Sequence, residues 1–268
     1  MRIESRNNPT IKNTTALRDK RERDEKGLFY FEGVHLLEEY LRAGNTPKAI
    51  FVREDVSVKY SPLTESAGCE IYTVTESVYS KLSEEKAPQG IFTVSERLPN
   101  IRFAESDITL SDMAAGIKGN SVMLADLRDA GNVGTVIRTA AALDCAVLLC
   151  GSCADIYSSK TVRATMGALF TAEIYVCPET NKAVNAMQGC GKRVIASALD
   201  SRAEKLGELE IKETDCFAVG NEGQGLDKAV IEQCGKACFI PMSDKTESLN
   251  AAIAASILLW EARRGKAL

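Results

Sequence analysis

The second half of the sequence alternates short apolar runs with segments of helical periodicity, and this alternation constrains the fold more than any other feature. Six continuous apolar runs are strand candidates, at residues 122–126, 146–150, 173–177, 193–198, 216–220 and 238–242. Helical patterns lie between most of them, and a last helix is expected over residues 248–264. Strands without polar alternation are typical of a mostly parallel sheet that helices cover on both faces. The sequence therefore predicts an α/β fold for this half.

The first half shows a shorter alternation of the same kind. Strands are expected at residues 28–32, 48–52, 69–74 and 90–94, with helices over residues 9–25, 35–43 and 76–86. Residues 98–118 lack a long period and contain Pro99, which marks a boundary. We therefore expect a small α/β domain at residues 1–97, a linker at 98–118 and a larger α/β domain at 119–268.

Composition narrows the class of protein. A chain of 268 residues has enough material for two domains. No apolar run approaches the roughly 20 residues that a membrane helix needs. The polar N-terminal stretch lacks the apolar core of a secretory signal, so a cytoplasmic location is expected and a membrane is not.

The nine cysteines are an odd number at irregular spacing, and most lie in apolar runs. Free cysteine in such runs acts as a small hydrophobic residue. Cys150 and Cys153 form a CxxC, which would suit a redox pair or half of a zinc site. Cys234 and Cys238 are candidates for a second ligand pair, but nothing aligns them. We expect reduced, structural thiols and no metal.

Charge is unevenly distributed along the chain. The net charge of −4 argues against a basic nucleic-acid binder as a whole, yet residues 2–26 carry eight basic side chains against five acidic ones. Either this is a solvated helix with paired charges or it contacts a phosphate backbone. In the second case the expected RNA-binding residues are Arg6, Lys12, Arg18 and Arg21.

Three unusual stretches, at residues 126–138, 220–226 and 239–260, each follow a predicted strand. Ligands of open parallel sheets bind outside the carboxyl ends of the strands, so we expect the stretches to converge on one pocket. In the third, a polar loop after Pro241 is expected to open into a helix at Ser248, with Leu249 and Asn250 just inside. Free backbone N–H groups and the positive end of the helix dipole would then face the ligand.

The first two stretches contain candidates for chemistry. Asn132 is placed to cap a helix, and Arg138 follows on an apolar helix, where it needs a partner. Arg138 either pairs with Asp126 or Glu222, or contacts an anion or a hydroxyl. In the second stretch, three glycines surround Asn221 and Glu222 in the order GxxGxG, not the dinucleotide-binding order GxGxxG. This is either a plain tight turn or a loop that approaches a ligand.

Together these motifs carry a family resemblance. NxGxxxR (Asn132, Gly134, Arg138), GNEGxGL (residues 220–226) and IPM…SLN (residues 240–242 and 248–250) resemble, in this order, the signature motifs of the SpoU (TrmH-like) RNA ribose 2′-O-methyltransferases of the SPOUT class. The likeness covers roughly residues 120–262 and includes KTVRATMGALF at 160–170. Residues 5–12 and 29–36 are similar, more weakly, to the RNA substrate-binding domain that many members carry.

The resemblance implies a trefoil-knotted C-terminal methyltransferase domain with a mostly parallel sheet, preceded by a small α/β RNA-binding domain. It also implies that S-adenosylmethionine binds between the knot loops. The residues implied to bind this cofactor are Leu199, Gly220, Asn221, Gly225, Ile240, Met242, Ser248 and Leu249.

The resemblance further makes Arg138 the catalytic arginine by position. Because a guanidinium stays protonated, we expect Arg138 to orient the hydroxyl, bind phosphate and stabilise the alkoxide. The resemblance implies that Asn132, Glu222, Ser248 and Asn250 complete the site by hydrogen bonding. His35, the one histidine, belongs to the other domain, so a histidine base is not expected.

These inferences predict an S-adenosylmethionine-dependent methyltransferase that modifies a ribose 2′-hydroxyl in structured RNA, with ribosomal RNA favoured over transfer RNA. A homodimer through the methyltransferase domain is implied by the resemblance. The alternatives are a transfer RNA 2′-O-methyltransferase and a non-catalytic RNA-binding protein that keeps the fold. An NAD-dependent oxidoreductase is disfavoured, because the first βα turn lacks an acidic residue about 20 positions further on.

Overall fold

The computed structural model describes residues 1–246 and 248–266, which form two compact units. Unit 1 comprises Met1–Leu98 and Asp155–Phe170, and unit 2 comprises Pro99–Ala154 and Thr171–Leu268. The chain therefore leaves unit 2 after Ala154 and re-enters it at Thr171. The inserted segment folds as a part of unit 1.

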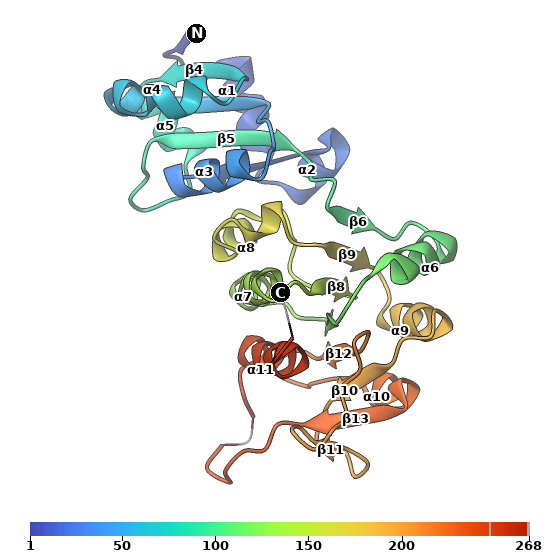
Figure 1. Cartoon of the computed structure of the whole chain (residues 1–268). Helices are drawn as coiled ribbons and strands as arrows, with labels where there is room; N and C mark the ends of the chain where they lie inside the picture. The colour runs from blue at the N-terminus through green and yellow to red at the C-terminus, as the bar shows by residue number, and fades with distance from the viewer. Residues whose placement is uncertain (247, 267–268) are drawn as a thin grey trace. The chain divides into compact units, whose positions relative to one another are not determined.

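The described residues of unit 1 form a mixed five-stranded sheet of order β1–β4–β3–β5–β2 (Figure 1). Strand β5 is antiparallel to both β2 and β3, whereas the other pairs are parallel. The strands are β1 (Arg2–Ile3), β2 (Leu28–Glu32), β3 (Ala49–Arg53), β4 (Glu70–Val74) and β5 (Ile91–Glu96). The helices of residues 1–98 are α1 (Pro9–Ala16), α2 (Lys20–Lys26), α3 (Val34–Arg42), η1 (Glu54–Val56), α4 (Ser57–Glu65) and α5 (Glu76–Leu82).

The two faces of this sheet are covered by different parts of the chain. Helices α1 and α5 contribute Ile11 and Tyr79 to one core. Aromatic side chains from alternate strand positions pack in the same core. The inserted segment, with α8 (Ser159–Ala164) and η2 (Ala168–Phe170), supplies aromatic partners for β2. The ring centroids of Phe29 and Tyr157 are 4.8 Å apart, and those of Phe31 and Phe170 are 5.3 Å apart. Alternate residues of β2 thus pack against segments distant in sequence.

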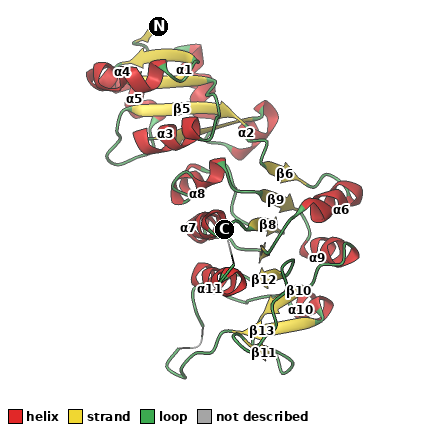
Figure 2. Cartoon of the chain, in the orientation of Figure 1, coloured by secondary structure: helices red, strands yellow, loops and turns green. Residues whose placement is uncertain are grey.

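The described residues of unit 2 form an eight-stranded, all-parallel sheet of order β11–β13–β10–β12–β7–β8–β9–β6. Figures 1 and 2 show α7 and α11 on one face and α6, α9 and α10 on the other. The strands are β6 (Ile101–Phe103), β7 (Ser121–Ala125), β8 (Ala146–Cys150), β9 (Ile174–Cys177), β10 (Val194–Ser197), β11 (Glu204–Lys205), β12 (Cys216–Val219) and β13 (Lys236–Phe239). The helices are α6 (Asp107–Gly116), α7 (Ala130–Ala142), α9 (Thr180–Gly189), α10 (Lys228–Cys234) and α11 (Ala251–Arg263).

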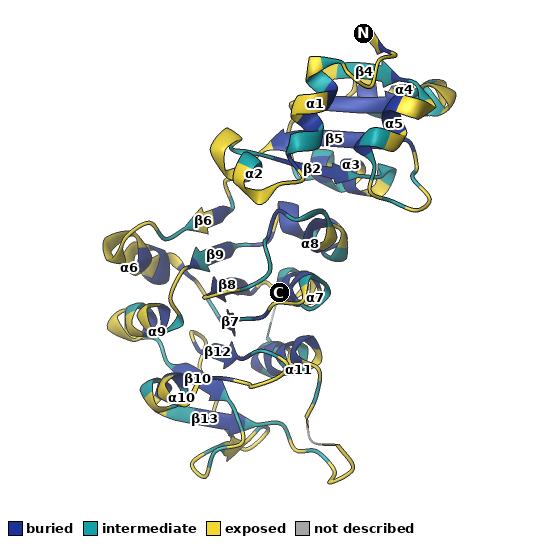
Figure 3. Ribbon diagram, turned by 180° about the vertical axis from the view of Figure 1, so that it is seen from behind, coloured by how far each residue is buried: buried dark blue, intermediate teal, exposed yellow. Residues whose placement is uncertain are grey.

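The expected fold class is confirmed, because a small mixed-sheet domain accompanies an all-parallel α/β domain. Helices cover both faces, so every residue of β7 and β8 is buried, which explains their continuous apolar runs (Figure 3). The α1–α2 region differs from expectation, since the single helix predicted at residues 9–25 is two helices. The break arises because the Asp19 side chain caps α2 by accepting from the Arg21 N–H.

The expected domain limits also differ from the two units. The predicted linker at 98–118 contains β6 and α6, because Ile101 pairs with Ile174 and both Leu110 and Met113 join the core of unit 2. The inserted residues 155–170, expected in the second domain, pack within unit 1. The assignment of separate functions to the two units stays a prediction.

Two connections cross at the carboxyl end of the parallel sheet. Strand β11 lies beyond β13, so residues 198–203 pass the carboxyl end of β13 on their way from β10. The chain leaving β13 runs in the opposite direction to α11, which packs on α7 and β12. Connections of a sheet rarely cross on one edge. The crossing is the arrangement that the implied trefoil knot requires, and the knot itself stays a prediction.

The nine cysteines are free thiols, and six of them are buried. Among residues 1–246 and 248–266, no cluster of histidine, cysteine and carboxylate side chains is suited to a metal ion. In the same described part of the chain, no helix has the length and apolar character to cross a bilayer.

Candidate functional site

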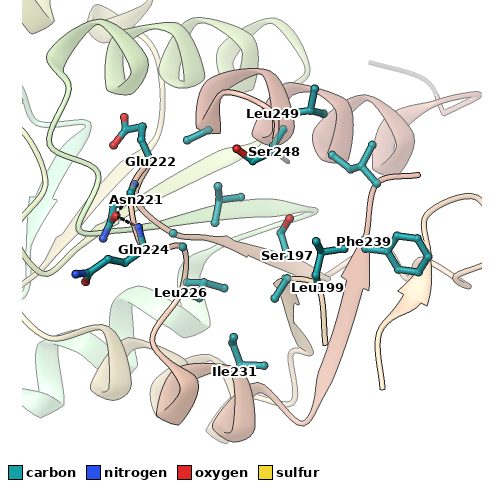
Figure 4. A pocket seen from close by; sticks show the side chains of 18 of the residues that line it. Ser197, Leu199, Asn221, Glu222, Gln224, Leu226, Ile231, Phe239, Ser248 and Leu249 are labelled. Carbon is teal, nitrogen blue, oxygen red and sulfur yellow. Dashed lines mark hydrogen bonds between the residues drawn. The ribbon is translucent and has the colours of Figure 1, made fainter. Parts of the chain in front are cut away.

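A cavity of about 480 Å³ opens at the carboxyl ends of β10, β12 and β13 (Figure 4). Ligand pockets in proteins typically measure about 300–1,000 Å³, so the cavity can hold a small molecule. All eight residues expected to bind the cofactor line it: Leu199, Gly220, Asn221, Gly225, Ile240, Met242, Ser248 and Leu249. The second and third motif stretches therefore meet in one cavity.

The loop at residues 220–226 is closed tightly by its glycines. A Cβ atom on Gly220 would lie 2.0 Å from the carbonyl carbon of Gly225, which leaves no room for a side chain. Gly225 itself has a φ of +68°, a conformation that side chains disfavour. The Asn221 side chain accepts from the N–H groups of Gly223 at 3.0 Å and Gln224 at 2.8 Å. The loop is thus a fixed wall of the cavity.

The third motif stretch differs from the prediction at its helix start. Helix α11 begins at Ala251, not at Ser248, and Asn250 is its N-cap. Oδ1 of Asn250 accepts from the N–H groups of Ala252 and Ile253, at 2.9 and 3.2 Å. Because the cap ends the helix there, Ser248 and Leu249 belong to the preceding loop, where they line the cavity.

The first motif stretch joins the site through Asn132, but not as a cap. Asp129 caps α7, and its carboxylate accepts from the Asn132 N–H at 2.8 Å. The Asn132 side chain is therefore free to bond elsewhere. Its Nδ2 donates to Oε1 of Glu222 at 2.5 Å, and its Oδ1 accepts from Nδ2 of Asn250 at 3.1 Å. One residue from each motif stretch thus enters a single hydrogen-bonded chain.

Arg138 lies apart from this cavity. It is exposed on α7 and lines an open hollow with Thr139, Ser256 and Trp260. Neither expected carboxylate pairs with it among the described residues. The Asp126 carboxylate accepts from the Ser152 N–H, and the Glu222 carboxylate accepts from Asn132. The guanidinium is therefore available to another molecule.

The expected RNA-binding residues of unit 1 fall into two groups. Arg6 and Lys12 are exposed, and no ion pair joins either to a described residue. Arg18 donates to the last carbonyls of α5, at Lys81, Leu82 and Ser83. Arg21 pairs with Glu25 on the surface of α2, where Lys20–Asp24 and Lys26–Glu22 are similar pairs. The exposed charges of α2 thus follow the paired, solvated alternative, whereas Arg23 of the same helix is buried against Asp155.

Several lining residues were absent from the prediction. They are Ser197, Ala198, Val219, Gly223, Gln224, Leu226, Ile231, Phe239, Ala251 and Ala254. Glu222 also lines the cavity, whereas it was predicted as a catalytic residue and not as a cofactor contact. Ser197 and Phe239 are the last residues of β10 and β13. The rule that ligands bind at the carboxyl ends of parallel strands could have located both.

The cavity wall combines apolar and polar surface. Leu199, Ile231 and Leu249 offer apolar side chains, and Leu199 is 76% exposed at the rim. The hydroxyls of Ser197 and Ser248 have no hydrogen-bond partner among the described residues. A ligand with a flat apolar part and several polar groups would match both kinds of surface.

Family models match nearly the whole chain. Residues 119–260 match the SpoU rRNA Methylase family, and residues 8–93 match the MRM3-like substrate binding domain. The first match spans the parallel sheet from just before β7 to within α11, and so includes all three motif stretches.

Known proteins resemble the chain over most of its length. It is 33% identical to the 23S rRNA (guanosine(2553)-2′-O)-methyltransferase RlmP of Bacillus subtilis, over 97% of this chain and 98% of that protein. It is 27% identical to the mitochondrial rRNA methyltransferase 3 of Mus musculus, over 93% of this chain and 70% of that protein. A crystal structure of an AdoMet-bound rRNA methyltransferase from Sinorhizobium meliloti superposes with a TM-score of 0.83 at 30% identity, covering 98% of this chain and 97% of the other.

Proposed function

This chain belongs to the SpoU rRNA methylase family, and from that premise we propose that it transfers a methyl group from S-adenosylmethionine to a ribose 2′-hydroxyl of ribosomal RNA. The function is supported most directly by the meeting of the second and third motif stretches in one cavity, to which Asn132 of the first stretch is hydrogen-bonded. The 23S rRNA 2′-O-methyltransferase activity of the Bacillus subtilis relative supports this substrate, and the AdoMet-bound Sinorhizobium meliloti structure supports this donor.

The cavity suits S-adenosylmethionine. Leu199, Ile240 and Leu249 would pack against its adenosine, and Gly220 would let the backbone approach it closely. The unpaired hydroxyls of Ser197 and Ser248 would meet its polar groups. When bound, the donor supplies a methyl group on a sulfonium.

Arg138 would act on the RNA rather than on the donor. Its guanidinium would bind a phosphate beside the target ribose and orient the 2′-hydroxyl, since a cation near a developing alkoxide lowers its energy. Asn132 and Asn250 would hold the reacting groups through their shared hydrogen bonds.

A homodimer would bring Arg138 to a cavity. Arg138 lies outside the cavity of its own chain, on the surface shared by α7 and α11. That surface also exposes Ile253 and Trp260, at 49% and 58%. Exposed apolar side chains of this size are enriched at protein interfaces. We therefore place the dimer contact on α7 and α11 of the methyltransferase unit, with Arg138 serving the partner's cavity.

Unit 1 would bind the RNA outside the target nucleotide. Arg6 and Lys12 are its proposed phosphate contacts because neither is paired internally among the described residues. Arg21 is a weaker candidate, since an exposed ion pair is worth only about 0–1 kcal/mol and a phosphate can replace its partner. Arg18 would support the fold of α5 instead. The free thiols fit a reducing, cytoplasmic setting.

Mapping of 2′-O-methyl groups tests the function. RNA from cells lacking the gene would be incubated with the protein and S-adenosylmethionine, then hydrolysed with alkali, which spares the phosphodiester beside a methylated ribose. We expect one new protected position in ribosomal RNA. Protection confined to transfer RNA would instead favour the transfer RNA methyltransferase.

Calorimetry with S-adenosylmethionine tests the non-catalytic alternative. Measurable binding is expected for the wild type and for Arg138→Ala, whereas Arg138→Ala should lose methyl transfer. A wild type that binds RNA but not the donor would identify a binding protein that only keeps the fold.

A further inference from the structure

Glu222 is the one titratable side chain in the cavity wall among the described residues. The other side chains there are apolar, hydroxyl or carboxamide groups. Arg138 lies outside the cavity, and a guanidinium keeps its protons at any ordinary pH. A ribose hydroxyl is a weak nucleophile that needs a group to accept its proton. The carboxylate of Glu222 is positioned to do this.

A directional chain of hydrogen bonds fixes this carboxylate. Backbone N–H groups only donate, so Oδ1 of Asn250 is held as an acceptor at the start of α11, at 2.9 and 3.2 Å. Its Nδ2 must then donate to Oδ1 of Asn132, at 3.1 Å. The Nδ2 of Asn132 in turn donates to Oε1 of Glu222, at 2.5 Å. The donor and acceptor of every link are therefore fixed from the start of α11 onward, and the Glu222 carboxylate is the last acceptor of the chain.

The second carboxylate oxygen remains open. Oε2 of Glu222 has no hydrogen-bond partner among the described residues, and the side chain lines the cavity. One oxygen is thus anchored and the other is free to meet a substrate. A general base has this arrangement when its orientation is set by a neighbouring group.

We propose that Glu222 is the general base of the methyl transfer, an inference that rests on the proposed function. Oε2 accepts the proton of the 2′-hydroxyl while the hydroxyl oxygen bonds to the methyl carbon. The carbon–sulfur bond breaks in the same step, and its electron pair stays on the sulfur, which becomes a neutral thioether. The proton then passes from Glu222 to water. Asn132 and Asn250 are positioning residues, because they act through the carboxylate.

Other charges on the elements joined by this chain do not line the cavity. They are Arg128, Asp129 and Arg138 on the α7 side and Asp244, Lys245, Glu261 and Arg263 on the α11 side. Asp129 is bonded to the Asn132 N–H, and Arg138 lies in the separate hollow. Among the charged side chains of these elements that the structure describes, only that of Glu222 lines the cavity.

Glu222→Gln separates proton acceptance from structure. The glutamine has nearly the same shape and keeps an Oε1 acceptor for Asn132, but it cannot take a proton. With RNA and donor saturating, we expect single-turnover methylation to fall about 100- to 10,000-fold, the usual contribution of a general base. Calorimetric affinities for S-adenosylhomocysteine and for the RNA should stay within about threefold of wild type. Glu208→Gln, which removes an exposed carboxylate of the same unit, serves as the charge control.

A further readout does not depend on how well Glu222→Gln folds. Methylation by Glu222→Ala should be partly restored by added formate, a small carboxylate.

Three results would overturn the proposal. Near-normal methylation by Glu222→Gln would show that no proton passes to this side chain. If Glu222→Gln lost its affinity for S-adenosylhomocysteine together with its methylation rate, Glu222 would be a binding group and not the base. An absence of formate rescue in a folded Glu222→Ala would contradict a role as base. If the wild type methylates no RNA while remaining folded, the proposed function fails instead.

Discussion

At the scale of single residues, Gly220 is the position least able to accept a change. A Cβ atom there would meet three backbone atoms, of Gly225 and Leu226, at 2.0 to 2.3 Å, and backbone cannot move aside as a side chain can. Gly220→Ala is expected to displace the loop at 220–226 and to destabilise the protein by about 1–3 kcal/mol, as overpacking does. Urea unfolding and S-adenosylhomocysteine calorimetry measure the two effects.

Gly223→Ala is the matched control for that prediction. Its Cβ would meet only the Asn221 side chain, at 3.7 Å, which is an ordinary contact. We expect stability within about 0.5 kcal/mol of wild type, as for substitutions without a strained site. Equal losses in both variants would mean that the loop tolerates no side chain for a reason other than the Gly220 contact.

Thiol reactivity gives a second residue-scale prediction. Burial raises the pKa of Cys216 to about 12, and the pKa of Cys153 to about 11. A raised pKa lowers the thiolate fraction, which for Cys216 is roughly one in 10,000 at pH 8. Iodoacetamide at pH 8 should therefore leave both thiols intact and label the exposed Cys190. Peptide mass mapping of the native protein checks this, and rapid labelling of Cys216 would contradict its burial.

Site residues could be predicted from motif positions, but not their partners. Asn132 follows a strand in a recognisable pattern, so its presence at the site was predictable. Its bond to Asn250 joins residues 118 positions apart, and only the folded sheet brings them together. Asp129 also offers a cap three residues before Asn132, and this alternative explains why the expected cap was wrong.

At the scale of elements, the start of α11 combines a structural and a functional role in Asn250. Asn250→Ala removes the cap and should destabilise the protein by about 0.5–2 kcal/mol. Asn250→Asp keeps an acceptor for the helix N–H groups, so stability should hold. It cannot donate to Asn132, however, so the chain to Glu222 reverses or breaks and methylation should fall at least tenfold.

Thermal unfolding and methylation rates of the two variants, measured together, check this prediction. A stable Asn250→Asp with full activity would mean that the donor side of the amide has no function. A large stability loss in Asn250→Asp would mean that the cap alone does not account for the residue.

Strands and helices were predictable in proportion to their apolar pattern. The strands β7, β8 and β12 are buried throughout, so their continuous apolar runs gave their positions within one or two residues. The helix α4 was missed because its apolar residues do not recur at helical spacing, and Val58 is 86% exposed. Helix α6 and strand β6 were missed for a similar reason, since a strand of three residues has too little pattern to detect.

At the scale of the whole molecule, the inserted segment could not have been predicted from its sequence position. Residues 155–170 lie inside the stretch that resembles the methyltransferase family, yet they pack within unit 1. Its aromatic residues show no preference in sequence for either unit. Their location depends on which apolar face remains uncovered after each sheet forms, and the face of β2 that carries Phe29 and Phe31 is such a face.

Phe170 tests whether this segment stabilises unit 1. Its ring lies 5.3 Å from that of Phe31 and 5.0 Å from that of Tyr40, and it is almost fully buried. Phe170→Ala should therefore cost about 3–5 kcal/mol, and the loss should fall on unit 1. Hydrogen exchange is expected to show faster exchange in β2 and α3, with the cavity strands β10 and β12 still protected. Phe217→Ala, in β12, is the matched control and should reverse this distribution. Faster exchange in β8 and β9 alone after Phe170→Ala would show instead that the segment belongs energetically to unit 2, although its contacts lie within unit 1.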